Sequence, residues 1–128
     1  MIVDTSAIVA ILRGEAEARS FLQTLLDHPG AQISAGSWIE LGPALAALGQ
    51  PDLDSQLVLI VRKLAMIIAP VTAEQAEIGR KAYRQYGKGQ HPARLNFGDC
   101  FSYALAKATG EPLLFKGNDF AQTDITPA

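Results

Sequence analysis

The chain has 128 residues, a length that predicts a single domain covering residues 1–128. Hydrophobic residues make up 48% of the chain, enough for a packed core, and this excludes a disordered protein. The net charge of −2 excludes a general polycationic binder of nucleic acid. The single cysteine, the absence of a long apolar run and an N-terminus without a secretory pattern predict a cytoplasmic protein that does not associate with membranes.

The first half of the chain alternates short apolar runs with helical patterns. A helix starting at Thr5 or Ser6 should end at Leu12, because either hydroxyl can cap its first turn. Pro43 should kink or shorten the third helix, since proline removes a backbone hydrogen bond. The elements predicted here are strands at 2–3 and 32–34 and helices at 5–12, 15–27, 37–48 and 53–65.

The second half contains two clear helix starts. Thr72 and Gln75 form a capping box that leads into a helix ending near Gly87. After a loop over 88–95, Asn96 is a predicted N-cap for a helix ending near Thr109. Strands are predicted at 66–71, 113–115 and 123–125. Short strands alternating with helices indicate an α/β fold, in which a short central parallel sheet is flanked by helices in a three-layer sandwich.

Four carboxylates stand out against this predicted sheet. Asp4 ends the first strand, Asp119 follows the strand at 113–115, Glu40 is an isolated charge on an apolar helix, and Asp99 lies in the first turn of its helix. Ligands bind beyond the carboxyl ends of parallel strands, so we expect these side chains to converge there. Their mutual repulsion would be offset by a divalent cation, and the lack of histidine or cysteine ligands favours Mg²⁺, with Mn²⁺ as a substitute, over Zn²⁺.

Each of these carboxylates also admits an ordinary structural interpretation. Asp4 is suited to capping the first helix, Asp99 to offsetting a helix dipole, and Asp119 to a turn. Glu40 is compatible with a water-exposed helix face, although a buried unpaired carboxylate would be costly. Spacing alone leaves these alternatives open.

The sequence resembles a known family when its segments are taken together. The opening Met1–Ser6, the internal Glu40, the segment 95–100 (LNFGDC) and the segment 114–120 (LFKGNDF) are similar to the PIN domains of VapC toxins, in the same order. This resemblance covers Met1 to Ile125 and implies a PIN-domain-like fold. It also implies that the protein is the toxin of a type II toxin–antitoxin system and a Mg²⁺-dependent endoribonuclease.

The resemblance carries specific implications for the site. Asp4 and Asp99 would be the principal metal ligands, Glu40 and Asp119 would complete the catalytic site, and Ser6 and Asn118 would support it. Asp124 stays open as an alternative to Asp119. A metal-activated water would cleave RNA and leave a 5′-phosphate and a 3′-hydroxyl. The expected partners are a VapB-type antitoxin, a transfer or ribosomal RNA substrate, and a second copy in a homodimer.

Basic residues cluster in one stretch of the sequence. No acidic residue lies between Glu77 and Asp99, and this window together with Lys116 gives candidate RNA contacts. A solvated helix face is the other interpretation. The candidate RNA-binding residues are Arg84, Lys88, Arg94 and Lys116.

Other functions fit less well. A phosphoaspartate receiver needs paired acids at the first strand, and a haloacid-dehalogenase-like phosphatase needs Asp-x-Asp where this chain has Asp4-Thr5-Ser6. A PIN-fold RNA-processing nuclease without an antitoxin and a catalytically inactive PIN-fold binding module stay open.

Overall fold

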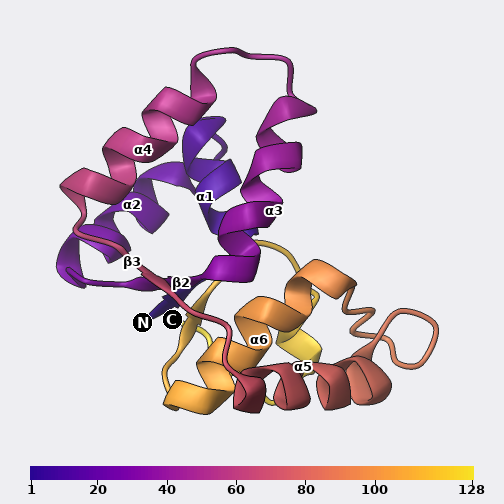
Figure 1. Ribbon diagram of the computed structural model, residues 1–128. Coiled ribbons are helices and arrows are strands. Elements are labelled where there is room, and N and C mark those ends of the chain that lie inside the picture. The colour runs from indigo at the N-terminus through magenta and orange to yellow at the C-terminus, as the bar shows by residue number, and fades with distance from the viewer.

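The computed structural model describes residues 1–128 and has three layers, with a parallel sheet between two groups of helices (Figure 1). The strands are β1 (Ile2–Val3), β2 (Gln32–Ser34), β3 (Ile67–Ala69) and β4 (Leu113–Leu114). All three pairings are parallel, in the order β3-β2-β1-β4. The predicted α/β sandwich with a central parallel sheet is therefore confirmed.

The helices divide between the two faces of this sheet. In Figure 1, α1 to α4 lie above the sheet, whereas α5 and α6 lie below it. No helix is long and apolar enough to cross a membrane. The bounds are α1 (Thr5–Leu12), α2 (Ala18–Asp27), α3 (Ala35–Ala46), α4 (Leu53–Lys63), α5 (Ala73–Tyr86) and α6 (Phe97–Thr109), followed by the short 3₁₀ helix η1 (Phe120–Gln122).

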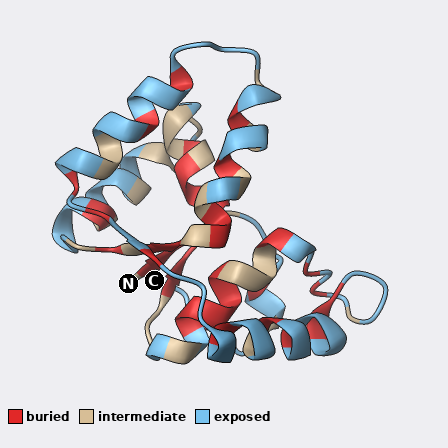
Figure 2. Ribbon diagram, in the orientation of Figure 1, coloured by how far each residue is buried: buried red, intermediate tan, exposed pale blue.

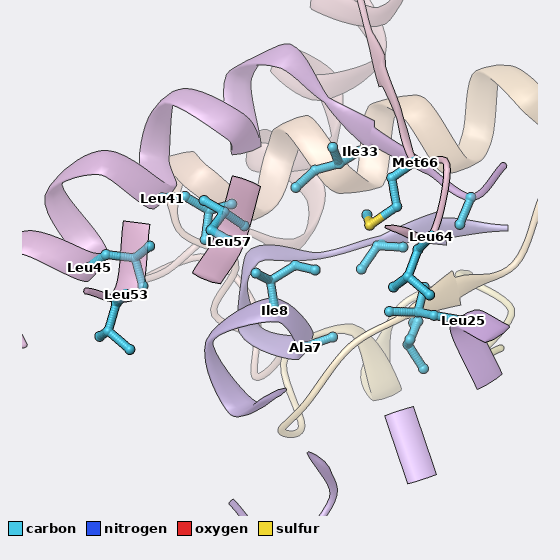
Figure 3. Close-up of a cluster of buried hydrophobic side chains, with 13 residues drawn as sticks. Ala7, Ile8, Leu25, Ile33, Leu41, Leu45, Leu53, Leu57, Leu64 and Met66 are labelled. Carbon is cyan, nitrogen blue, oxygen red and sulfur yellow. The ribbon is translucent and has the colours of Figure 1, made fainter. Parts of the chain in front are cut away.

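Two apolar clusters hold the layers together, one on each face of the sheet (Figure 2). Adjacent residues of a strand point to opposite faces, so Val3 joins the upper cluster and Ile2 the lower one. In the upper cluster, Ile8 lies near Leu41 and Leu57, which ties α1, α3 and α4 together (Figure 3). The site residues at the ends of these elements are thus carried by a packed core.

The structure differs from the sequence prediction at several element ends. The N-cap of α1 is Asp4 and neither Thr5 nor Ser6, because the Asp4 side chain accepts the Ser6 N–H. The predicted strand at 123–125 is wrong: residues 120–122 form η1, and only Pro127 bridges to β4.

Pro43 lies inside α3 without ending it. Proline removes the N–H that would bond to the carbonyl of Ile39. Ile39 is 73% exposed, so water can take that place at the surface. The helix continues to Ala46 and is as long as the predicted one, so Pro43 does not shorten it, and the turn carrying Glu40 is intact.

Candidate active site

Asp4 lies at the carboxyl end of β1 and is only 4% exposed. Its Oδ2 accepts the Ser6 N–H (2.9 Å) and the Ser6 hydroxyl (2.6 Å), and its Oδ1 accepts the Ser102 hydroxyl (2.6 Å). Ser6 Oγ in turn accepts the backbone N–H of Lys116 (3.0 Å). A buried carboxylate is costly unless donors surround it, and three donors do so here. The predicted position of Asp4 and the supporting contact of Ser6 are both present in the structure.

Glu40 reaches from α3 to the first turn of α6. A Cβ added at Gly98 would lie 2.5 Å from Glu40 Cδ, so the carboxylate lies directly against the glycine backbone. The approach is reciprocal, because Gly36 of α3 leaves room for the ring of Phe101 on α6. The absence of two side chains thus lets α3 and α6 pack closely, which places Glu40 beside the turn that carries Asp99.

Asp99 forms both halves of the capping box with Asn96. Its N–H bonds to the Asn96 side chain (2.8 Å), and its Oδ2 accepts the Asn96 N–H (2.9 Å). Burial is the main cause that raises the pKa of Asp99 to about 7; the charges of Asp4, Asp119 and Glu40 contribute to this rise, and the Asn96 N–H opposes it. The charges of the other three predicted carboxylates therefore all act on Asp99.

The pKa of Glu40 is shifted in the same direction as that of Asp99. Burial raises the pKa of Glu40 above its usual value, Asp4 adds to this, and the neighbouring Thr5 hydroxyl opposes it. The same Thr5 Oγ1 is buried and forms no hydrogen bond of ordinary geometry. Repelling, partly buried carboxylates are an arrangement that a hydrated cation would relieve.

Asp119 and Asp124 have different surroundings in the structure. Asp119 is exposed at the start of η1, and its charge acts on Asp99. Asp124 instead accepts the Tyr103 hydroxyl (2.7 Å) and the Lys107 ammonium (2.8 Å). Partial burial raises the pKa of Asp124, but these two hydrogen bonds outweigh that effect and hold the pKa below its usual value. The geometry favours Asp119 as the fourth acidic group.

The donor set fits a cation that prefers oxygen. No group of three or more histidine, cysteine, aspartate or glutamate side chains is arranged so that it could hold a metal ion. Asp4, Glu40 and Asp119 act on Asp99 through their charges without forming a closed coordination shell around one point. Mg²⁺ usually keeps several waters and needs only a few protein oxygens, so such an open set is suited to it.

The candidate RNA contacts have different surroundings. Lys88 and Arg94 line one polar hollow on the loop between α5 and α6, and Arg84 lies on α5 beside an apolar groove of about 560 Å³. Lys116 is paired with Glu15 and Glu17, which occupies its ammonium group. The structure therefore favours a structural role for Lys116 over a contact with phosphate.

Sequence reasoning missed several residues at this site. The buried Ser102 hydroxyl contacts both Asp4 and the Ser37 hydroxyl. Gly98, which has no side chain, leaves the space that the Glu40 carboxylate occupies. Asn118, predicted to support the site, is exposed, and its backbone carbonyl accepts the Ala121 N–H. Only the pairing of helices in space reveals these serines and glycines, since nothing in their local sequence distinguishes them.

Comparison with known proteins places the chain in a family. The sequence-family model of the PIN domain matches residues 1–125. Ribonuclease VapC42 of Mycobacterium tuberculosis is 46% identical over 129 residues, covering 100% of this chain and 98% of the relative. The chain belongs to the VapC ribonuclease family of PIN-domain proteins. Ribonuclease VapC of Mycolicibacterium smegmatis is 44% identical over 126 residues, covering 98% and 97% of the two chains.

Solved structures show the same PIN fold. VapC20 of Mycobacterium tuberculosis, a toxin that cleaves the sarcin–ricin loop, has a TM-score of 0.78 at 18% identity and covers 99% of this chain and 97% of its own. A toxin–antitoxin complex from Klebsiella pneumoniae has a TM-score of 0.70 at 20% identity, with 99% and 97% coverage. The predicted resemblance to PIN-domain VapC proteins is thus confirmed for sequence and fold.

Proposed function

We propose that this VapC-family protein is the toxin of a type II toxin–antitoxin system and a metal-dependent endoribonuclease. One observation carries the proposal. The charges of three carboxylates from separate parts of the chain, Asp4, Glu40 and Asp119, act on Asp99 and contribute, after burial, to its pKa of about 7. The identity of 46% to Ribonuclease VapC42 across the whole chain supports RNA as the substrate.

We assign the cation site to Asp4 and Asp99, with Glu40 and Asp119 contributing directly or through water. Mg²⁺ is the expected cation and Mn²⁺ its substitute, because oxygen is the donor in every case. A bound divalent cation would supply the positive charge that activates water and stabilises a phosphate under attack. Asp4 is held by three donors and is therefore the most rigid of the four, whereas exposed Asp119 is free to adjust to substrate.

The RNA itself is expected to reach this site across the basic surface of α5 and the following loop. Arg84, Lys88 and Arg94 have no acidic partner among the ion pairs of the structure, unlike Arg80, which pairs with Glu77 (2.8 Å). Cations without a partner are available to phosphate oxygens. A structured RNA of the transfer or ribosomal class is the proposed substrate.

Two protein partners complete the proposal. A VapB-type antitoxin would block the carboxylate site, and the toxin would act in the cytoplasm as a single domain over residues 1–128. A homodimer is supported by large apolar side chains at the surface, among them Ile39 (73% exposed) and Phe97 (76% exposed). Analytical ultracentrifugation tests this directly: Ile39→Lys should shift a wild-type dimer towards monomer.

The central experiment is RNA cleavage by purified, antitoxin-free protein. Total cellular RNA is incubated with Mg²⁺ or Mn²⁺ and then with EDTA, with Asp4→Asn and Asp99→Asn alongside. Discrete fragments bearing 5′-phosphates should form and should vanish with EDTA and with either variant. Asp124→Asn is the matched control, because Asp124 contacts only Tyr103 and Lys107 and should leave cleavage intact. Folded wild-type protein that cleaves nothing with either metal would contradict the nuclease and favour a PIN-fold binding module.

A further inference from the structure

Two buried serines form a continuous hydrogen-bonded connection to Asp4. Ser102 of α6 lies 2.6 Å from Asp4 Oδ1, and Ser37 of α3 lies 3.1 Å from Ser102 Oγ. Both serines are 0% exposed. The connection therefore joins the end of β1 to α3 and α6 entirely inside the protein.

The direction of these bonds follows from the number of protons. An ionised carboxylate only accepts, so Ser102 must use its single hydroxyl proton on Asp4. Ser37 must then donate to Ser102, because Ser102 has no second proton to give. The connection runs from Ser37 through Ser102 to Asp4, and each hydroxyl has a fixed orientation.

The same count limits what Asp4 offers to a ligand. A carboxylate has about four acceptor positions, two on each oxygen. Ser6 occupies both positions of Oδ2 with its N–H and its hydroxyl, and Ser102 occupies one position of Oδ1. One position of Oδ1 is left, so Asp4 is prepared to bind a cation through a single oxygen.

The spacing along the two helices ties the serines to the other carboxylates. Ser37 precedes Glu40 by three residues on α3, and Ser102 follows Asp99 by three residues on α6. Residues three apart share a helix face. Each serine therefore lies one turn from a carboxylate of the site, and the bond between the serines fixes the two helices relative to Asp4.

An ordinary core role would give Ser102 a different partner. A serine inside a helix commonly bonds to the carbonyl four residues earlier, or it points to solvent. Thr109, on the same helix, does the former with Leu105 O (2.8 Å). Ser102 instead makes its bonds to residues distant in the sequence, Asp4 and Ser37.

We propose that Ser102, oriented by Ser37, is a positioning residue that fixes Asp4 as a ligand through Oδ1 alone. This inference rests on the proposed cation site. Without the Ser102 hydroxyl, Asp4 keeps its bonds to Ser6 but loses the contact that fixes Oδ1, while the Ser37 hydroxyl loses its acceptor. Removing such an outer partner typically lowers metal affinity or activity by about 10–100-fold.

The test measures Mn²⁺ binding by calorimetry together with RNA cleavage. Ser102→Ala should weaken Mn²⁺ binding by about 10–100-fold and lower kcat, with KM for RNA unchanged because Ser102 is fully buried. Ser37→Ala keeps the bond from Ser102 to Asp4 and should have a smaller effect in the same direction; it also serves if Ser102→Ala does not fold. Ser34→Ala is the matched control, since Ser34 is equally buried and caps α3 through the Gly36 N–H (3.2 Å) without touching Asp4.

The outcomes separate this inference from the proposed function. Wild-type Mn²⁺ affinity and kcat in folded Ser102→Ala would overturn the positioning role and leave the nuclease standing. Equal losses in Ser34→Ala and Ser102→Ala would also overturn it, since they would reflect core disruption. Wild-type protein that binds no Mn²⁺ and cleaves no RNA would overturn both.

Discussion

Gly98→Ala should inactivate the protein without unfolding it. A Cβ at this position would lie 2.5 Å from Glu40 Cδ and 2.9 Å from Oε1. Carbon atoms pack at about 3.5–4.0 Å, so the carboxylate must retreat by roughly 1 Å or more. A displacement of about 1 Å at a catalytic site can cost on the order of 100-fold in rate. Stability should stay within about 1 kcal/mol of wild type, because alanine favours the helix and the obstructing group is a flexible side-chain end.

The assay compares initial cleavage rates and urea unfolding for Gly98→Ala and a matched control. Gly42→Ala lies on α3, the same helix as Glu40, and its added Cβ would meet nothing within 4 Å. It should retain full activity. In a double-mutant cycle, Gly98→Ala should cost nothing further once Glu40→Ala is present, because the three atoms nearest to the added Cβ all belong to the Glu40 carboxylate. Undiminished cleavage by Gly98→Ala would refute the requirement for Glu40 in its observed place.

Three further predictions concern charge. With EDTA present, ionisation of Asp99 opposes folding, because burial and then its acidic neighbours raise its pKa from 3.8 to about 7. Relative to Asp99→Asn, wild type should therefore be most stable below about pH 4 and should lose roughly 1–3 kcal/mol of unfolding free energy in urea as the pH rises through 7. Added Mg²⁺ should reduce this loss. A difference in unfolding free energy between the two proteins that does not change with pH would contradict the prediction. Arg84→Glu should weaken RNA binding and lower the slope of log K against log salt by about 0.7 or more, whereas Arg62→Glu on α4 should not. Asp124→Asn should lower the free energy of unfolding by about 1 kcal/mol with unchanged cleavage, and a large loss of cleavage would place Asp124 in the site.

Much of the fold could be predicted from local sequence alone. Strands β1 and β2 and the starts of α4, α5 and α6 match the prediction, because caps and apolar patterns act over a few residues. The strand predicted at 123–125 failed for a tertiary reason. Asp124 is held by Tyr103 and Lys107 of α6, and the chain meets the sheet only at Pro127.

The candidate site could be proposed from its charged residues and from Ser6, and the buried Gly98, Ser37 and Ser102 could not. Carboxylates at strand ends indicate a candidate site, because burying a charge is costly. Glycine and serine carry no such signal, and their roles depend on which helix packs against them. Gly98 and Ser102 both lie on α6, and each acquires its role from a residue on another element, Glu40 of α3 or Asp4 after β1.

The structural and functional interpretations of the two principal carboxylates turn out to be compatible. Asp4 caps α1 through Oδ2, which accepts the Ser6 N–H. Asp99 closes its capping box through Oδ2 as well, accepting the Asn96 N–H. In each case the helix start uses one carboxylate oxygen and fixes the orientation of the group, while Oδ1 keeps acceptor capacity for a ligand. If these two residues bind the proposed cation, the cap is what makes a flexible acidic side chain a rigid ligand, and a sequence pattern that indicates a cap does not count against a metal site.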